Sequence, residues 1–490
     1  MSLDRRTFLK LGGATALGAA LPVHARALAD ASAPLAPLPP ADHTIRIDNG
    51  LVEVAPNRII STTLYNDRFP GPLLRLREGR EVTIEIHNDT DIPEQLHWHG
   101  QRLPVDVDGS AEEGTPFIPA HGERRVTFTP GPPGLRFYHS HRFAGTDLRA
   151  GLYSGQLGLV YVEPRNEPGD YDQEVFLVLK EFGPSLTHLD DMGAGFLLPR
   201  GTDKTLEAIG ESAHMEYLQK GMTRGFEVEY ADFSINGKGL EFGEPIRVKE
   251  NQRVLFQILN GSATEIRSLA LPGHTFRVIA LDGNPVPTPA DVPVLWIAPG
   301  ERVTAVVHMT NPGIWAMADI DDDRLRGMGV VIEYARASGR IQWIAPSSAG
   351  WDYSIFGRKA PAAAPDDAIE LLFKKDNAAV QGFNRWLING AAFSMADMAP
   401  RFPLVRGRRY RLRMRNASED VHPIHLHRHV FEITKIAGRP TSGLMKDVVM
   451  VGAYQETEID FTATSAGLSL LHCHMQSHMD FGFMALFECR

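Results

Sequence analysis

Histidines gather at four places in this 490-residue chain, two near each end, and this spacing constrains the fold more than any other feature. The clusters are "HWH" at 97–99, "HSH" at 139–141, "HPIHLH" at 422–427 and "HCHMQSH" at 472–478, and they hold ten of the nineteen histidines. A single HxH is more often a pair of half-buried, hydrogen-bonded imidazoles than a ligand pair. Four clusters in one chain instead predict a shared metal site that brings the two ends of the chain together.

Strand geometry predicts how these residues divide between sites. Residues two apart on a strand project from one face, about 6.6 Å apart, and the residue between them points the other way. The pairs that share a face are His425 with His427 and His472 with His474. Cys473 and His422 have the opposite parity, so they are expected to form a separate mononuclear site. His478, beyond the strand end, can return to complete a set of two histidines and one cysteine.

The remaining histidines define a second, multinuclear site of eight imidazoles: His97, His99, His139, His141, His425, His427, His472 and His474. Eight neutral imidazoles without a carboxylate are too soft a donor set for Mg²⁺ or Ca²⁺ and too many for one zinc ion. A thiolate with two imidazoles is the trigonal set of blue copper. The donor chemistry therefore predicts copper at both sites.

The rest of the chain predicts an all-β protein built from one unit used three times. Short alternating segments run through residues 43–165, 172–340 and 366–490, with a Pro/Ala-rich linker near 354–367. The segments "EVTIEIHND", "QRVLFQILNGS" and "RYRLRMRNAS" recur, each as a strand that ends in Asn and a small polar residue. This weak internal repeat favours three β-sandwich domains.

The four clusters resemble the motifs HxHG, HxH, HPxHxH and HCHx₃H of three-domain multicopper oxidases, the family of laccases, bacterial copper-efflux oxidases and ferroxidases. The resemblance implies three consecutive cupredoxin-like Greek-key β-sandwiches, with a trinuclear copper site between domains 1 and 3 and type 1 copper in domain 3. It implies four coppers per chain. Their ligands would be His97 and His425 for type 2, His99, His139, His141, His427, His472 and His474 for the type 3 pair, and His422, Cys473 and His478 for type 1.

Three further residues occupy positions that have roles in that family. Asp108 stands where the family has an acid that orients water near the type 2 copper, although a turn aspartate before a glycine is the alternative. Many bacterial members carry a proton-delivering acid directly after the last type 1 histidine, where this chain has Met479. Fungal laccases place an acid one residue later, at the position of Asp480, so Asp480 is a candidate proton relay. Phe483 stands in the axial position of type 1 copper, where many members have methionine. Met484 is its rival, but adjacent residues of an extended segment face opposite ways.

The resemblance implies one-electron oxidation of a small donor coupled to four-electron reduction of O₂ to water. Phenols and aromatic amines are the expected donors, because the methionine-rich segment of copper-efflux oxidases is missing. Oxidation of cuprous or ferrous ions for metal tolerance is the alternative. A scaffold that has lost its coppers is disfavoured by the complete ligand set, and a copper nitrite reductase lacks this HCH arrangement.

The N-terminus predicts export. "DRRTFLK" at 4–10, followed by "LGGATALGAALPV", resembles a twin-arginine signal, so residues 1–30 are expected to be a signal peptide read by the Tat translocon. The expected location is the periplasm or the outside of the cell. No later stretch is apolar enough to predict a membrane span, and a formal charge of −10 without a basic stripe argues against nucleic acid as a partner. A monomer is expected.

Replacement of both Arg5 and Arg6 by Lys is expected to stop export, because the twin-arginine pair is the part of the signal that the translocon reads. The precursor would then accumulate in the cytoplasm. Fractionation followed by immunoblotting measures this. Continued export of the Lys–Lys protein would contradict the interpretation of residues 1–30.

Overall fold

The structure, a computed structural model, describes residues 39–165, 170–188, 194–221, 224–346 and 350–490. The predicted signal peptide at 1–30 lies outside these residues. The chain divides into residues 1–40 and 41–490, and every helix and strand below belongs to the second unit. No helix in the described part of the chain is long and apolar enough to cross a membrane.

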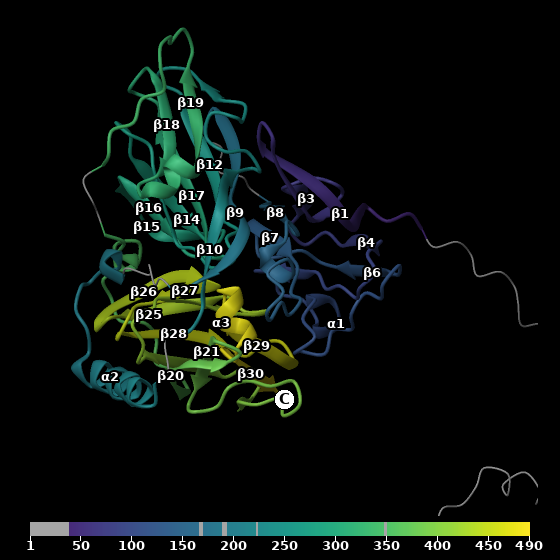
Figure 1. Ribbon diagram of the computed structural model, residues 1–490, viewed down its shortest axis with the longest axis vertical. Helices are drawn as coiled ribbons and strands as arrows, with labels where there is room; N and C mark the ends of the chain where they lie inside the picture. Colours follow the sequence, from purple (N-terminus) through teal and green to yellow (C-terminus); the bar gives the residue numbers. More distant parts are fainter. Residues whose placement is uncertain (1–38, 166–169, 189–193, 222–223, 347–349) are drawn as a thin grey trace, which may run out of the picture. The chain divides into compact units, whose positions relative to one another are not determined.

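Six β-sheets form three sandwiches, in agreement with the predicted fold class (Figure 1). The first sandwich has sheets of strand order β2–β1–β4–β6 and β3–β8–β7–β5. Its strands are β1 His43–Ala55, β2 Arg58–Tyr65, β3 Gly71–Arg77, β4 Val82–Asn88, β5 His97–His99, β6 Glu123–Phe128, β7 Gly134–His139 and β8 Leu157–Glu163. Two histidine clusters fall on β5 and at the end of β7.

The second sandwich has sheets ordered β10–β9–β12–β17–β14–β15 and β11–β19–β18–β13–β16. Its strands are β9 Gln173–Thr187, β10 Glu227–Ile235, β11 Ile246–Val248, β12 Arg253–Asn260, β13 Arg267–Ala270, β14 Phe276–Leu281, β15 Asn284–Val292, β16 Val294–Ile297, β17 Arg302–His308, β18 Ile314–Asp319 and β19 Gly329–Tyr334. None of the four histidine clusters lies in this sandwich.

The third sandwich carries the other two histidine clusters. Its sheets are ordered β21–β20–β23–β28–β25–β26 and β22–β30–β29–β24–β27. Its strands are β20 Asp367–Val380, β21 Phe383–Ile388, β22 Arg401–Leu404, β23 Arg409–Asn416, β24 His422–Leu426, β25 Phe431–Ile436, β26 Arg439–Lys446, β27 Val448–Val451, β28 Glu456–Thr462, β29 Gly467–Cys473 and β30 Met484–Cys489.

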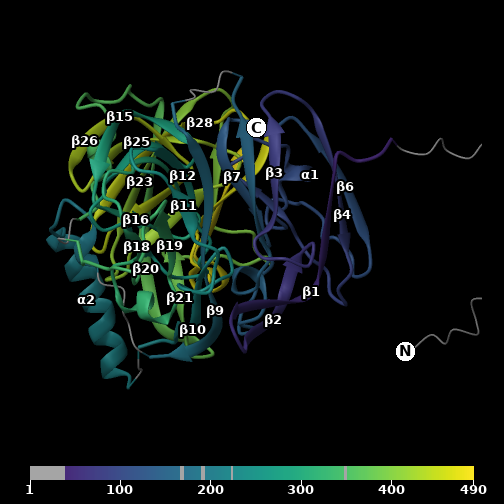
Figure 2. The ribbon, with the colours of Figure 1, turned by 90° about the horizontal axis from the view of Figure 1, so that it is seen from above.

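Helices are few. They are α1 Val105–Asp108, α2 Lys204–Gln219 and α3 Gln476–Asp480, with 3₁₀ turns η1 Gly151–Tyr153, η2 Ala194–Phe196, η3 Asp322–Arg326 and η4 Tyr353–Ile355. The longest, α2, belongs to the middle part of the sequence but contacts β20 of the third sandwich (Figure 1, Figure 2). The two short helices α1 and α3 carry Asp108 and His478, so both lie at the site described below.

The sequence repeat corresponds to one strand position used three times. β4, β12 and β23 each pair in parallel with the first long strand of their domain and antiparallel with the next strand of the sheet. The asparagine that ends each strand, Asn88, Asn260 or Asn416, is fully buried. Each side-chain amide donates to backbone carbonyls, and each side-chain oxygen accepts the backbone N–H two residues later. The repeated asparagine closes the following turn.

Asn416→Ala is expected to destabilise the third sandwich. Asn416 donates to the carbonyls of Asp420 at 2.7 Å and Gly452 at 3.0 Å, and each buried group left without a partner costs about 1–3 kcal/mol. The apparent midpoint of thermal unfolding should fall by several degrees, as calorimetry would measure. Thr462→Ala, an exposed change on β28, is the control and should leave the midpoint unchanged. Equal midpoints for both variants would contradict this role.

Candidate metal centre

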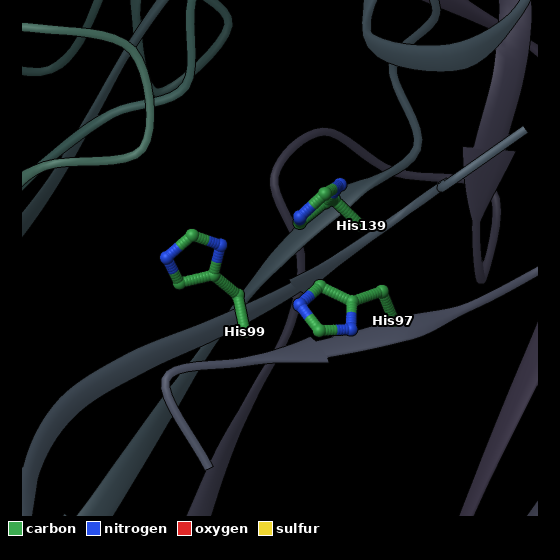
Figure 3. Close-up of side chains that lie close together, drawn as sticks. All are labelled: His97, His99 and His139. Atoms are coloured by element: carbon green, nitrogen blue, oxygen red, sulfur yellow. The ribbon is translucent and has the colours of Figure 1, made fainter. Parts of the chain in front are cut away.

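Two paired strands of the first sandwich bring their histidines together. β5 and β7 are antiparallel, with His97 opposite His139 and His99 opposite Phe137. The alternation of the strand places the three imidazoles on one side of the sheet, and Figure 3 shows their rings directed toward a common space. His141 follows two residues after the end of β7, and its ring lies 5.4 Å from that of His97.

The third sandwich contributes its histidines in the same way. β24 and β29 are antiparallel, with His425 opposite His472 and Ile424 opposite Cys473. His425 and His472 therefore project to the face opposite that of Cys473, as the alternation of the sequence predicts. His427 and His474 lie one residue beyond the ends of these strands.

On the other face, Cys473, His422 and His478 converge. The sulfur of Cys473 is 3.8 Å from Nδ1 of His422 and 3.5 Å from Nδ1 of His478, and the two Nδ1 atoms are 3.3 Å apart. These separations suit three ligands of one ion, and the set is soft. Burial raises the pKa of the Cys473 thiol, so a metal must displace its proton to bind. Burial also lowers the pKa of His422, and that of His478 to about 3.

Aromatic rings surround this trigonal set. Trp386 is 1% exposed, and its ring centroid lies 4.2 Å from that of His478 and 4.8 Å from that of His422. Phe483 is fully buried and lies 4.8 Å from the His422 ring. Phe483 belongs to the same apolar cluster as Cys473. Met484 packs in a different cluster, with Phe393 and Met479 among its members.

In the eight-imidazole cluster, most rings have one nitrogen fixed by an acceptor. The ring N–H groups of His97, His139, His425 and His472 donate to the carbonyls of Asp108, Ser140, Asp447 and Cys473, at 2.6–2.9 Å. Those of His427 and His99 donate to the carboxylates of Asp108 and Asp447, at 3.0 and 3.1 Å. Such hydrogen bonds select the tautomer and orient each ring toward the metal.

The opposite nitrogens are the ones left for a metal. Among the described residues, Nε2 of His97, His139, His141 and His425 has no hydrogen-bond partner although it is buried. The remaining close approaches are between imidazoles, as between Nε2 of His427 and Nε2 of His472 at 3.1 Å. Buried lone pairs that face one another need protons or cations between them. The residues therefore fit bound metal ions.

Burial favours the uncharged form of six of the eight imidazoles. Desolvation, followed by the neighbouring histidines, lowers the pKa values of His99, His139, His425, His427 and His472 well below the usual range, and that of His474 to about 3. Neutral imidazole is the form that binds metal. These six imidazoles are thus in the form that binds a metal.

The rings pack closely throughout the cluster, and the shortest centroid distances, 3.8 Å between His99 and His425 and 4.0 Å between His97 and His427, join rings of the first and the third sandwich. His141, His427 and His472 have centroids 4.9–5.3 Å apart, and His99, His139 and His474 have centroids 5.0–5.7 Å apart. His97 and His425 are 5.9 Å apart. Each of these sets combines imidazoles from the first and the third sandwich, so neither sandwich alone holds a complete site.

Asp108 lies at the cluster, and its predicted role in orienting water stays a prediction. Its carboxylate is fully buried, with Oδ2 3.0 Å from Nδ1 of His427 and 3.1 Å from Nδ1 of His97. Two neighbouring acids, which sequence reasoning missed, are also present. Glu113 lies 3.6 Å from Nδ1 of His427, and Glu112 lies 3.5 Å from Nδ1 of His141. Burial and the adjacent Asp108 raise the pKa of Glu113.

Asp480 is placed differently. Its carboxylate accepts the backbone N–H groups of Ala144 at 3.1 Å and Gly145 at 2.8 Å, and the side-chain amide of Gln476 at 2.9 Å. Burial raises the pKa of Asp480 to about 7. None of its hydrogen bonds to described residues involves a histidine of the cluster. Its role as a proton relay therefore stays a prediction.

Asp447 is a third acid that could not be recognised from the sequence. Its carboxylate accepts from His99 and from both terminal nitrogens of Arg302, at 2.5 and 2.6 Å. Arg136 of the first sandwich also donates to it, at 3.2 Å. The sequence carries only one sign of it, a charged pair, Lys446–Asp447, inside the apolar run "LMKDVVMV". Such a pair is stable in a core only when other groups satisfy it.

A buried thiolate–imidazole set beside an eight-histidine cluster defines a copper-binding oxidoreductase centre. Three sequence models, each described as Multicopper oxidase, match residues 48–167, 210–332 and 364–490. These ranges cover most of the chain. The chain belongs to the multicopper oxidase family, whose members are oxidoreductases with O₂ as acceptor.

Relatives extend over nearly the whole chain. Multicopper oxidase MmcO of Mycobacterium tuberculosis is 28% identical over 431 residues, which cover 86% of this chain and 81% of that protein. L-ascorbate oxidase of Cucurbita maxima is 22% identical and covers 86% of this chain and 85% of that protein. The crystal structure of a multi-copper oxidase from Pseudomonas thermotolerans has a TM-score of 0.67 at 24% identity and covers 92% of this chain and 100% of that one. This last likeness supports the fold.

The positions of Phe483 and Met484 generate a prediction about the cysteine site. Phe483→Met is expected to lower the reduction potential of copper bound at the Cys473 site. A sulfur donor favours Cu(II) over Cu(I), whereas a phenyl ring donates no electron pair to the metal. Met484→Leu should change the potential little, since Met484 packs in the other apolar cluster. Redox titration of the visible absorption band measures both. A large fall for Met484→Leu with none for Phe483→Met would contradict this assignment.

Proposed function

We propose that this chain binds four coppers and uses them to oxidise small phenolic or aromatic donors at the expense of O₂. His422, Cys473 and His478 would hold type 1 copper. His97 and His425 would hold type 2 copper, and His99, His139, His141, His427, His472 and His474 would hold the type 3 pair. Copper bound at these positions supplies one-electron chemistry at the first site and reduction of O₂ to water at the second.

The chain connects the two sites covalently. Cys473 belongs to the trigonal set, while its neighbours His472 and His474 belong to the cluster. The carbonyl of Cys473 also accepts the ring N–H of His472 at 2.8 Å. The tripeptide His472–Cys473–His474 thus joins the residue that would receive an electron to those that would hold the O₂-reducing metals.

The two histidines of the trigonal set differ in their surroundings. Nε2 of His422 lies 2.9 Å from the hydroxyl of Ser418, and the residue is fully buried. His478 is 4% exposed, and the residues after it line a cavity of about 470 Å³. Phe143, Phe393 and Phe481 form apolar walls of this cavity. We infer that electrons from a donor pass through His478.

This aromatic-walled cavity beside His478 is the observation that carries the laccase-like assignment. A planar phenol can pack against aromatic rings, which contributes about 0.5–1.5 kcal/mol beyond the burial of surface. A bare metal ion gains little from such walls. Phe483, whose ring lies beside that of His422, would offer a bound copper no sulfur donor, and the higher potential that this favours would fit a donor that is hard to oxidise.

A second cavity supports the alternative, oxidation of a metal cation. It has a volume of about 570 Å³ and is lined by Glu265, Asp319, Asp321, Asp322 and Asp323, and also by Val421, the neighbour of His422. Carboxylates favour cations there. However, Nε2 of His422 is already hydrogen-bonded to the hydroxyl of Ser418. Asp323 is paired with Arg267 at 2.5 Å, so its charge is partly neutralised. We therefore place cation oxidation second.

Paired variants test the two assignments. Phe143→Ala should raise the KM for a neutral phenol such as 2-methoxyphenol several-fold, because the donor loses an aromatic wall. Asp322→Asn, in the acidic cavity, should leave that KM unchanged. Oxygen uptake with the phenol, with Cu(I) and with Fe(II) measures both, and Cys473→Ser, which removes the thiolate ligand, should abolish every oxidation.

Faster oxidation of Cu(I) or Fe(II) than of any phenol would contradict the laccase-like assignment. A higher KM for the metal ion in Asp322→Asn, with no effect of Phe143→Ala on any donor, would support the cation oxidase.

A further inference from the structure

We propose that the cavity beside His478 selects aromatic donors that carry a carboxylate, and that Arg385 binds this carboxylate. This inference deepens the proposed function and rests on it. The donor class is a phenolic acid, with its ring between the phenylalanines of the cavity and its acidic group at the opening.

The cavity is assembled from two sandwiches around Asp480. One wall is the loop 143–147, which follows the second histidine cluster, and the other consists of residues of the third sandwich. The carboxylate of Asp480 holds the backbone of Ala144 and Gly145 in place. Gly145 has φ +58, and a Cβ there would contact the Phe143 ring at 2.8 Å. The loop conformation that positions Phe143 therefore requires glycine.

Of the three aromatic rings that line the cavity, one is accessible to a ligand from several sides, and the other two are nearly buried and form the base of the cavity. Phe143 is 55% exposed, whereas Phe393 and Phe481 are each 8% exposed. Phe481 stacks on Phe383 at 4.4 Å, and its carbonyl accepts the backbone N–H of Trp386 at 2.9 Å. Because Trp386 contacts the His478 ring, a donor on Phe481 lies next to the residues that surround the trigonal set.

Arg385 supplies an uncommitted positive charge. It lies on β21, is exposed and lines the same cavity. Asp376 is its cross-strand neighbour, but the Arg385 side chain makes no hydrogen bond or ion pair with any described residue. Most other arginines of the third sandwich pair with acids, as Arg409 and Arg411 do with Asp460.

The two acids of the cavity do not cancel this charge. The oxygens of Asp480 are occupied by two backbone N–H groups and by Gln476. Asp147 accepts the backbone N–H of Arg149 at 3.2 Å and pairs with its side chain at 3.8 Å. Arg385 is therefore the charged group left to bind a ligand. A planar guanidinium binds a carboxylate with two parallel hydrogen bonds.

The reaction balances with the established acceptor. Each phenolic acid loses one electron and one proton from its phenol group and becomes a phenoxyl radical, while its carboxylate stays intact. Four such donors supply four electrons and four protons, and one O₂ takes them up to give two waters.

The test compares 4-hydroxy-3-methoxycinnamate with its methyl ester, which differ in charge and little in ring structure. In the wild-type protein, kcat/KM should favour the acid. Arg385→Gln should lower the ratio of kcat/KM for the acid to kcat/KM for the ester by about tenfold. The change should come from a higher KM for the acid, because the charge-assisted hydrogen bonds to its carboxylate are lost. Arg385→Lys should give an intermediate ratio of kcat/KM values, because lysine keeps the positive charge but cannot form the two parallel hydrogen bonds of a guanidinium. Arg340→Gln, an exposed arginine that does not line the cavity, is the matched control.

A binding measurement separates this inference from the proposed function. 3,4-Dimethoxycinnamate has the carboxylate but no phenolic hydroxyl, so calorimetric titration measures binding without turnover. Arg385→Gln should weaken its binding about tenfold. Binding of this compound through Arg385, with no oxidation of any phenol, would remove the laccase-like function and leave the anion site. The inference would be overturned if wild type and Arg385→Gln had the same acid-to-ester ratio of kcat/KM and bound 3,4-dimethoxycinnamate equally well. A higher kcat/KM for the ester than for the acid in the wild-type protein would also overturn it.

Discussion

Eight imidazoles are buried in one interior and have to be fixed in orientation, and the rest of the structure depends on this constraint. Burial removes water from the rings, which disfavours the protonated form, and each ring disfavours protonation of its neighbours further. A neutral imidazole has one N–H to donate, and the protein accepts most of these protons at carbonyls or carboxylates. The remaining lone pairs face inward, which is why the site suits cations of a soft metal.

The acceptors of the cluster explain the architecture around it. Asp447 orients His99 through its carboxylate and His425 through its carbonyl. A buried carboxylate is stable only with partners, and Arg302 of the middle sandwich and Arg136 of the first provide them. Lys446 in turn pairs with Asp282 at 2.9 Å and Glu301 at 3.1 Å. The middle sandwich carries none of the four histidine clusters, yet through this charge network it supports the position of two imidazoles.

Much of this could be predicted from the sequence, because it follows from local periodicity. Strand alternation separates Cys473 from His472 and His474, and the structure shows the cysteine and the cluster on opposite faces. The repeated strand with a terminal asparagine predicts three equivalent sheets, and Asn88, Asn260 and Asn416 make the same hydrogen bonds. These features depend on residues within a few positions of one another.

The rest could not be predicted, because it depends on contacts between residues distant in the chain. Glu113 approaches His427 across more than 300 residues, and Trp386 reaches both His422 and His478 from another strand. The cavity at Arg385 requires the loop 143–147 of one sandwich to meet β21 of another. Nothing in the sequence around Arg385 distinguishes it from the other exposed arginines. Only the folded structure shows that most of those arginines pair with acids and that the Arg385 side chain does not.

We propose that this chain holds one copper at a three-coordinate cysteine site and three in the histidine cluster. Anomalous diffraction at the copper edge, from crystals of the copper-loaded protein, tests it most directly. We expect one anomalous peak for a copper ion bound by Cys473, His422 and His478, without Met484 as a ligand. Three further peaks are expected among the eight imidazoles. A single peak, zinc in place of copper, or a bond from the sulfur of Met484 would contradict the account.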